Sequence, residues 1–329
     1  MRKPWIIFFM GVFALLCLFI TPIFGLKIIN IREILTQTLS ETDAYVFWSI
    51  RVPRVLTAFV AGASLAISGM SFQAMFRNPL ATESTLGVAS GASLGAAIYV
   101  RIGLGIAVLG LSGISVFAFA GAVLTILIVY GLSRIKQGFS TSTMLLAGVA
   151  LSFFFSSIII MIQSVVDIHN SFRLLRWLMG GLSMVGYNSI INILPFAVIG
   201  ITIIMLLRNE LNLLLAGDDL AISRGVDTNK VKGLLFFATS LTVGGIVAVC
   251  GPIGFVGMIV PHICRLIIGT DHKYLAPAVV LVGGGFLTIC DTVARVIISP
   301  SEMPVGVITA LLGGPFFIWL LITNKAGRI

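Results

Sequence analysis

The sequence predicts an all-α, polytopic membrane protein of about ten transmembrane helices. Of its 329 residues, 58% are hydrophobic and only 10% are charged, whereas a soluble domain carries roughly a quarter charged residues. The apolar runs reach the length of about 20 residues that a helix needs to cross the ~30 Å hydrocarbon core. Only helices and closed barrels satisfy every backbone polar group there. We therefore expect residues 1–329 to form one transmembrane domain.

The predicted spans follow one another with short connections. The first apolar run follows Met1, Arg2 and Lys3 and in this respect resembles a signal peptide, but it is too long for the apolar core of such a peptide. We interpret it as the first span. The ten predicted spans cover residues 5–26, 54–76, 86–100, 106–132, 143–166, 190–207, 233–250, 255–268, 274–298 and 304–323. An even number of spans places both termini on the same side of the membrane.

Positive charge is distributed as expected for an oriented membrane protein. The formal net charge is +9, but the lysines and arginines lie between apolar runs and not on one basic face, so no nucleic-acid partner is expected. If both termini are cytoplasmic, the positive-inside rule is obeyed, because the cytoplasmic segments then hold Arg2, Lys3, Arg77, Arg134, Lys136, Arg208, Arg224, Lys230, Lys232, Arg265, Lys273, Lys325 and Arg328. Arg51, Arg54 and Arg295 remain outside at span ends, where snorkelling to the lipid headgroups is one explanation.

Small residues in the spans predict close helix packing and a candidate inverted repeat. Glycine, alanine and serine let helix backbones approach where lipid provides no hydrophobic drive. One pattern of small residues in the second span recurs in the seventh, at Gly62, Ala66 and Gly69 and again at Gly244, Ala248 and Gly251. In this topology the two spans run in opposite directions, as an inverted repeat requires. Because the chain has 35 glycines, chance recurrence is the alternative explanation.

Motifs for chemistry are missing from the sequence. No segment matches the G-x-x-x-x-G-K-[ST] phosphate loop, so ATP hydrolysis would require another polypeptide, and no catalytic residues are assigned. The four cysteines lack metal-binding spacing, so neither a metal site nor a cofactor is expected. Asp291 is the one acidic residue well inside a span, and Arg295, four residues later, is expected to pair with it. An ion-coupled secondary transporter remains an alternative, with Asp291 as its candidate ion site.

The segment 208–232 is unlike a plain connector. Asp218 is expected to cap a short helix that Gly225 ends, and Asp227 is expected to cap the next helix, which continues into the seventh span. Two short helices on the cytoplasmic face could transmit force from a soluble motor domain. The alternative is an ordinary loop that lies on the headgroups.

Several blocks of sequence resemble the vitamin B12 and iron-siderophore (FecCD-type) permease family of ABC importers. They occur in the family's order and cover the chain from Arg51 to its end. The blocks are Arg51-Val52-Pro53-Arg54, Gly62 to Gly69, Arg77-Asn78-Pro79-Leu80-Ala81, Leu86 to Ala92, Ser140-Thr141-Ser142, Leu146 to Ala150, Trp177-Leu178-Met179-Gly180-Gly181, Gly251 to Gly257, Pro261 to Arg265 and Glu302 to Val307. Thr82-Glu83 and Met303 depart from the family's usual residues.

The resemblance implies partners and roles. It implies the fold of the vitamin B12 permease, a homodimer in the bacterial cytoplasmic membrane with both termini inside, two ATPase subunits below and a substrate-binding protein outside, working by alternating access. Arg51, Arg54 and Arg295 would pair with glutamates of the binding protein, and Asn78, Leu80, Thr141 and Ser142 would form a cytoplasmic gate. The ATPase-coupling segment would contain Asp218, Leu220, Ala221, Arg224, Gly225 and Val226, with Ala221 and Gly225 seated in the ATPase cleft.

The sequence indicates the cargo only weakly. Met161, Gln163 and Ser164 in the fifth span are expected to line the route. Methionine and phenylalanine suit a bulky, partly apolar chelate better than a small hydrated anion. We therefore favour a ferric siderophore, with haem, cobalamin and molybdate as alternatives.

Overall fold

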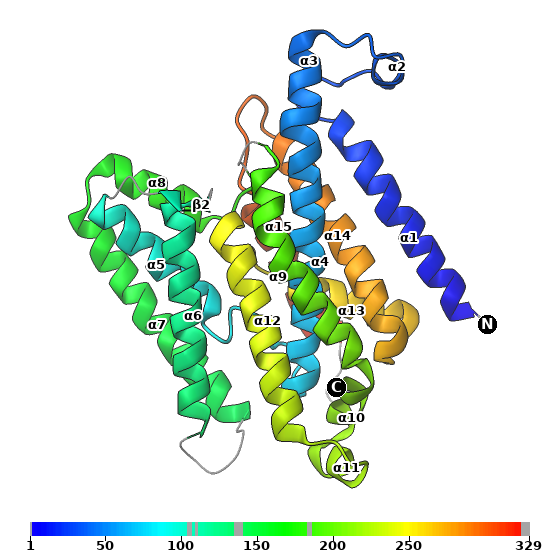
Figure 1. The fold of residues 1–329 in the computed structure, drawn as a ribbon, viewed down its shortest axis with the longest axis vertical. Helices are drawn as coiled ribbons and strands as arrows, with labels where there is room; N and C mark the ends of the chain where they lie inside the picture. Colours follow the sequence, from blue (N-terminus) through cyan, green and yellow to red (C-terminus); the bar gives the residue numbers. More distant parts are fainter. Residues whose placement is uncertain (1, 104–106, 109–110, 135–140, 183–185, 324–329) are drawn as a thin grey trace.

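The computed structural model describes residues 2–103, 107–108, 111–134, 141–182 and 186–323. Ten helices of the described residues each overlap one predicted span, and most of them run along the long axis of the molecule (Figure 1). They are α1 (Arg2–Ile20), α4 (Val52–Phe76), α5 (Val88–Ile102), α6 (Gly113–Arg134), α7 (Thr141–Val165), α9 (Asn188–Leu206), α12 (Thr228–Cys250), α13 (Val256–Ile268), α14 (His272–Val296) and α15 (Val305–Thr323). Within the described part of the chain, seven apolar helical stretches are long enough to span a membrane, while Val88–Ile102, Val256–Ile268 and Val305–Leu320 are shorter.

Short elements mark the two ends of the bundle. One end, here called the α8 end, carries the 3-10 turn η1 (Thr21–Ile23), α2 (Ile31–Leu35), α3 (Glu41–Tyr45), the π-helical turn η2 (Val46–Arg51), the strand pair β1 (Ala107–Val108) and β2 (Leu111–Ser112), and α8 (Ile168–Leu178). The opposite end, here called the α11 end, carries α10 (Arg208–Ala216) and α11 (Asp218–Ser223). Three predicted cytoplasmic cations, Lys136, Lys325 and Arg328, lie outside the described residues.

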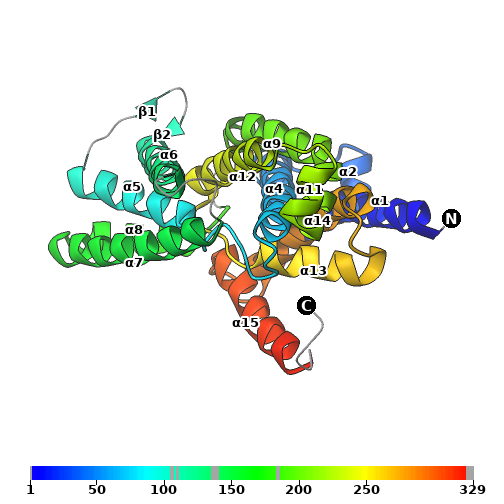
Figure 2. The same ribbon diagram turned by 90° about the horizontal axis from the view of Figure 1, so that it is seen from below.

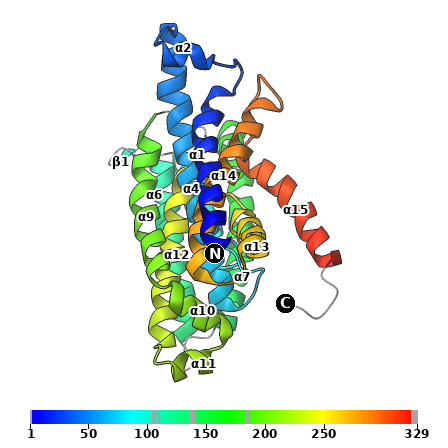
Figure 3. The ribbon, with the colours of Figure 1, turned by 90° about the vertical axis from the view of Figure 1, so that its right-hand side faces the viewer.

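The helices form two groups that α12 joins. Figure 2 shows α5, α6, α7 and α8 on one side, and α1, α4, α13 and α14 on the other. Helix α4 is central, since it packs against α9, α12, α13 and α14. Helix α15 projects away from the bundle (Figure 3) and contacts only α13 and α14 extensively within the described residues. Large hydrophobic side chains are exposed along α15 and also along α7, so each of these helices leaves a long apolar face uncovered.

Glycines allow the central helices to touch, as the small-residue pattern predicted. A side chain on Gly69 would overlap the carbonyl of Gly257 on α13, and one on Gly62 would overlap the carbonyl of Gly283 on α14. The backbone of α4 therefore approaches those of α13 and α14 until no Cβ fits between them. This close approach increases the dispersion contact between helices in lipid, where the hydrophobic effect does not drive them together.

Two irregular segments interrupt the bundle at related places. Helix α4 ends at Phe76, with Arg77 in the left-handed region at φ 49°, and residues 78–87 lead into α5. Similarly, α12 ends at Cys250, and Phe255 at φ 69° precedes α13. Much of each segment is buried by surrounding helices, the setting in which irregular backbone is tolerated at membrane depth. Helices α4 and α12 run in opposite directions, as the candidate repeat predicts.

Candidate transport and coupling sites

The segment between α9 and α12 folds into two short helices, as its sequence indicated. Helix α11 ends at Ser223, and Gly225 adopts φ 84°. The Gly225 N–H donates to the Ile222 carbonyl at 2.9 Å, and the Val226 N–H donates to the Ala221 carbonyl at 3.0 Å, which together form a glycine-type helix stop. Asp227 then caps α12 by accepting from the Lys230 N–H at 3.1 Å. The positive φ explains why glycine occupies position 225.

Asp218 does not cap α11, so that prediction is wrong. Gly217 stands at the cap position, and the Asp218 carboxylate turns toward α12, where Lys232 Nζ donates to it at 2.6 Å. The Lys232 side chain is only 4% exposed, so its ammonium depends on this partner. Arg77, at the end of α4, lies 3.7 Å from the same carboxylate. Asp218 therefore ties α11 to two of the central helices.

Helix α11 lies at the end of the molecule (Figure 1), and its exposed surface combines two large apolar side chains with polar and charged ones. Leu220 is 44% exposed and Ile222 58%, and Arg224 and Gly225 are exposed beside them, while Val226 is half-buried. Ala221, in contrast, is fully buried within this chain. The expectation that Ala221 seats in a partner's cleft does not fit this conformation. Ile222 was missed by sequence reasoning, although its exposed neighbour Leu220 was included.

The predicted gate residues lie at the α11 end. Asn78 Oδ1 accepts from the Leu80 N–H at 2.9 Å, forming a turn that directs the exposed Leu80 side chain outward. Thr141 begins α7 and is half-buried, while Ser142 is exposed; Ser140 lies outside the described residues. A side chain on Gly148 of α7 would overlap the backbone of Leu86, so α7 packs directly against the segment that follows Asn78.

The three arginines that were expected to dock a binding protein are buried at the α8 end. Arg54 donates from Nε and Nη2 to Asp291 at 2.9–3.0 Å and from Nη1 to Glu302 at 2.6 Å. Arg295 lies 3.2 Å from the same Asp291, as predicted for this pair. Arg51 donates to three backbone carbonyls, of Pro22, Ile23 and Lys27, at 2.7–3.2 Å.

These contacts change the interpretation of the arginines. Arg51, Arg54 and Arg295 are 7%, 8% and 4% exposed, so snorkelling is wrong for all three. Their pairing with glutamates of a binding protein stays a prediction. Their charges are used inside the chain, where they join η1, α4 and α14. Sequence alone showed only the pair on one helix, because the Asp291 contact to Arg54 spans 237 residues.

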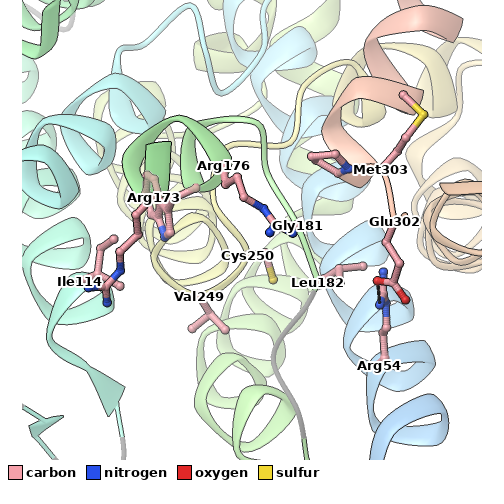
Figure 4. A pocket seen from close by; sticks show the side chains of 12 residues that line it. Arg54, Ile114, Arg173, Arg176, Gly181, Leu182, Val249, Cys250, Glu302 and Met303 are labelled. Carbon is pink, nitrogen blue, oxygen red and sulfur yellow. Dashed lines mark hydrogen bonds and ion pairs between the residues drawn. The ribbon is translucent and has the colours of Figure 1, made fainter. Parts of the chain in front are cut away.

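A cavity of about 280 Å³ opens beside this cluster (Figure 4). Arg173 and Arg176 project from α8 on one side, and Arg54 and Glu302 lie on the other. The remaining lining residues are Ile114, Trp177, Gly181, Leu182, Val249, Cys250, Met303 and Pro304. Helix α8, which no predicted span includes, is amphipathic, and its Asp167 cap accepts from the Asn170 N–H at 3.0 Å.

Three of the sequence blocks that carry the family resemblance meet at this cavity. The Gly181 N–H donates to the Cys250 carbonyl at 2.8 Å, and the Gly306 N–H donates to the Gly180 carbonyl at 3.3 Å. Gly180 has φ 69°, and any side chain there would overlap the Pro252 carbonyl. The junction of the ends of α8 and α12 with the start of α15 therefore requires glycine, and it fixes the cavity walls relative to one another.

Comparisons with known proteins agree with the fold and these blocks. The FecCD transport family matches residues 9–323. The cobalamin import system permease protein BtuC of Halobacterium salinarum is 39% identical over 85% of this chain and 74% of its own length. The hemin transport system permease protein HmuU of Yersinia pestis is 35% identical over 92% of this chain and 91% of its own.

A solved structure shares the architecture as well as part of the sequence. An inward-facing metal-chelate type ABC transporter superposes with a TM-score of 0.86 at 28% identity, covering 97% of this chain and 99% of the solved one. The chain therefore belongs to the FecCD transport family, the vitamin B12 and iron-siderophore type of ABC importer permease.

Proposed function

We propose that this chain is the membrane-spanning subunit of an ABC importer that carries a metal chelate across the bacterial cytoplasmic membrane. In this proposal the α11 end and both termini face the cytoplasm, and the α8 end faces the outside. Alternating access follows when an ATPase, as a separate polypeptide, selects between two packings of the bundle. Membership of the permease family and the distribution of positive charge both support this orientation.

The observation that carries the proposal is the construction of α11. A rigid short helix with exposed Leu220 and Ile222 stands at the end of the molecule, and Asp218 connects it to α12 and α4 through Lys232 and Arg77. Two large exposed apolar side chains beside the charged Asp219 and Arg224 suit contact with a protein partner. A partner that pushed on it would move central helices directly, which is the arrangement that a coupling segment requires.

The gate is proposed for Asn78, Leu80, Thr141 and Ser142. Asn78 and Leu80 follow the end of α4, and Thr141 and Ser142 begin α7, at the proposed cytoplasmic face. The Leu80 side chain is exposed. Helix α7 packs against the segment after Asn78. Movement of α4 and α7 would therefore change the width of the cargo route at its cytoplasmic end.

A second copy of the chain is proposed as the main partner within the membrane. Helix α7 exposes Leu146, Phe153, Phe154 and Met161, and α15 exposes Leu311, Leu312 and Ile318. Lipid can cover such faces, but the poor attachment of α15 to its own bundle (Figure 3) favours a protein partner on its free side. The route for the cargo would then run between two copies, past Met161, Gln163 and Ser164 of α7.

The cargo is proposed to be a metal chelate delivered by a binding protein that docks at the α8 end. The relatives are named for cobalamin and hemin transport, and the solved neighbour for metal chelates. The apolar face of α7 suits a bulky chelate, and we favour a ferric siderophore over molybdate. Direct docking through Arg51, Arg54 and Arg295 would require these side chains to leave their present partners.

The cognate binding protein provides the sharpest test of the cargo. Its affinity for ferric siderophores, haem, cobalamin and molybdate can be measured separately, followed by ATP hydrolysis of the reconstituted complex with each loaded form. We expect tight binding and stimulation with one class of metal chelate. Stimulation by molybdate alone would contradict the proposed cargo, and absence of any stimulated hydrolysis would contradict the coupling role of the chain.

A further inference from the structure

The cavity between α8 and the start of α15 carries more positive charge than the chain neutralises. Of its three arginines, Arg54 is engaged by Asp291 and Glu302. Arg173 and Arg176 are exposed, and neither forms an ion pair or hydrogen bond within the described residues. Glu302 is the one acidic residue that lines the cavity, and its carboxylate already accepts from Arg54 at 2.6 Å. Two guanidinium groups therefore stand on the cavity wall without a counter-charge.

Trp177, which follows Arg176 in the sequence, also lines the cavity. The indole Nε1 of Trp177 is buried and has no hydrogen-bond partner among the described residues, although Trp177 lines the cavity. Indole nitrogen can only donate a hydrogen bond, and a buried donor without an acceptor is unfavourable. Because this nitrogen is not accessible, Arg173 and Arg176 are the donors that the cavity presents to whatever enters it, and its single carboxylate already accepts from Arg54.

The rest of the wall is apolar. Ile114, Leu182, Val249, Met303 and Pro304 also line the cavity. A small hydrated oxyanion would gain nothing from these side chains. A ligand with anionic groups on a larger, partly apolar body would use both kinds of surface.

We propose that this cavity receives the carboxylate groups of an anionic metal chelate, with Arg173 and Arg176 as the donors that bind it. The inference rests on the proposed transport function and names the chemical class of cargo at the α8 end. Guanidinium forks match carboxylates in bidentate geometry, and such charge-assisted bonds are stronger than neutral ones. Arg173 and Arg176 stand three residues apart on α8, so they face the same side of that helix and can hold one ligand together.

Binding can be tested with the full chain in nanodiscs of phosphatidylcholine. The probes are ferric citrate, an anionic chelate with carboxylates, and ferrichrome, a neutral hydroxamate chelate, each followed by quenching of indole fluorescence. We expect ferric citrate to bind the wild-type chain and to lose at least about tenfold in affinity when both Arg173→Gln and Arg176→Gln are present, since each lost pair removes charge-assisted hydrogen bonds. The affinity for ferrichrome should be the same in both proteins.

Two controls separate the loss of charge at this site from general effects. Arg101→Gln removes an exposed arginine from the end of α5 at the same end of the bundle, outside the cavity, and should leave ferric citrate binding unchanged. The double Arg173→Lys, Arg176→Lys variant keeps the charge and should restore part of the affinity. Thermal unfolding of every variant verifies that the fold is retained.

Several outcomes would overturn the inference. Equal affinity for ferric citrate in the wild-type and the double glutamine variant is one. Full competition by inorganic phosphate, or loss of ferric citrate binding when phosphatidylglycerol is added to the bilayer, would assign the site to a free oxyanion or a lipid headgroup. Weakened docking of the binding protein with unchanged ferric citrate affinity would assign the arginines to that protein. None of these results depends on ATP hydrolysis, so the proposed transport function would still stand.

Discussion

Arg54 and Asp291 are 237 residues apart in the chain and form a two-pronged contact at the α8 end. Nε of Arg54 donates to both carboxylate oxygens at 3.0 Å, and Nη2 donates to one of them at 2.9 Å. Asp291 is fully buried, and Arg295 approaches it from the other side at 3.2 Å. The contact fixes the start of α4 against the end of α14. The arginines that the family resemblance assigns to docking of a binding protein therefore also have partners within this chain.

Removing one member of this pair should destabilise the chain strongly. We expect Arg54→Leu to cost about 3–5 kcal/mol, because it leaves a buried carboxylate with poorer compensation. The double variant Arg54→Leu, Asp291→Leu should cost clearly less than the sum of the two single changes. The loss of stability in each variant is measured by heating the protein in detergent and recording the fraction that still elutes as folded protein in size-exclusion chromatography. Additive losses would show that the pair is not coupled.

Glu302 offers a matched comparison for the same arginine. It also contacts Arg54, at 2.6 Å, but its side chain is 41% exposed, and water can replace the lost partner. We expect Glu302→Gln to cost no more than about 1 kcal/mol. Asp291→Asn, which removes the buried carboxylate, is the comparison and should cost more. An equal loss in the two variants would mean that burial does not set the strength of these contacts.

Much of the fold was predictable because the apolar runs are physically constrained. All ten predicted spans overlap helices, since a run of about 20 apolar residues has few alternatives in lipid. The stop at Gly225 and the cap at Asp227 were also predictable, because each depends on neighbours only a few residues away. Turns and helix caps of this kind can be predicted because the residues that form them are neighbours in the sequence.

Features that depend on distant partners were not predictable. The sequence around Asp218 predicted a helix cap, but its carboxylate accepts a hydrogen bond from Lys232 on the following helix. Arg51 and Arg54 read as surface arginines because their partners come from other parts of the chain. Helix α8 is amphipathic and short, so hydropathy averaging missed it, although Arg173 and Arg176 at a spacing of three residues could have indicated one polar face.

The coupling surface predicts a difference between two substitutions at Gly225. A side chain there would meet nothing within 4 Å in this chain, and the residue has φ 84°. Asparagine tolerates this conformation, whereas tryptophan adds both strain and bulk. We expect Gly225→Asn to keep most cargo-stimulated ATP hydrolysis and Gly225→Trp to lose at least about tenfold, with normal membrane insertion of both. Equal hydrolysis in the two variants would contradict contact with an ATPase at this position.

Asp218 should matter more than its neighbour Asp219. Asp218→Asn leaves the buried Lys232 ammonium without a charged partner and should cost about 1–3 kcal/mol and weaken coupling. Asp219→Asn removes the same charge from an exposed position of α11 and serves as the control. Thermal stability and stimulated ATP hydrolysis should both fall only for Asp218→Asn. Identical behaviour of the two variants would show that the link from α11 to α12 is unimportant.

The close approach of α4 and α13 predicts a steric effect. Gly69→Val places a side chain on the Gly257 carbonyl and should cost about 1–3 kcal/mol or prevent folding. Gly131→Ala on α6, where a Cβ meets nothing within 4 Å, should be neutral or stabilising. Expression level and thermal unfolding measure both. Unchanged thermal stability of Gly69→Val would mean that α4 and α13 can separate without a loss of stability.

The central claim is that this chain is a conduit driven by a separate ATPase. Its most direct test is accumulation of the cognate metal chelate in sealed vesicles that contain the chain, with and without the ATPase subunit, and with the binding protein on the side of the α8 end. We predict accumulation only when the ATPase and ATP are both present, unaffected by collapse of the proton gradient. Accumulation by the chain alone, driven by an ion gradient, would contradict the account.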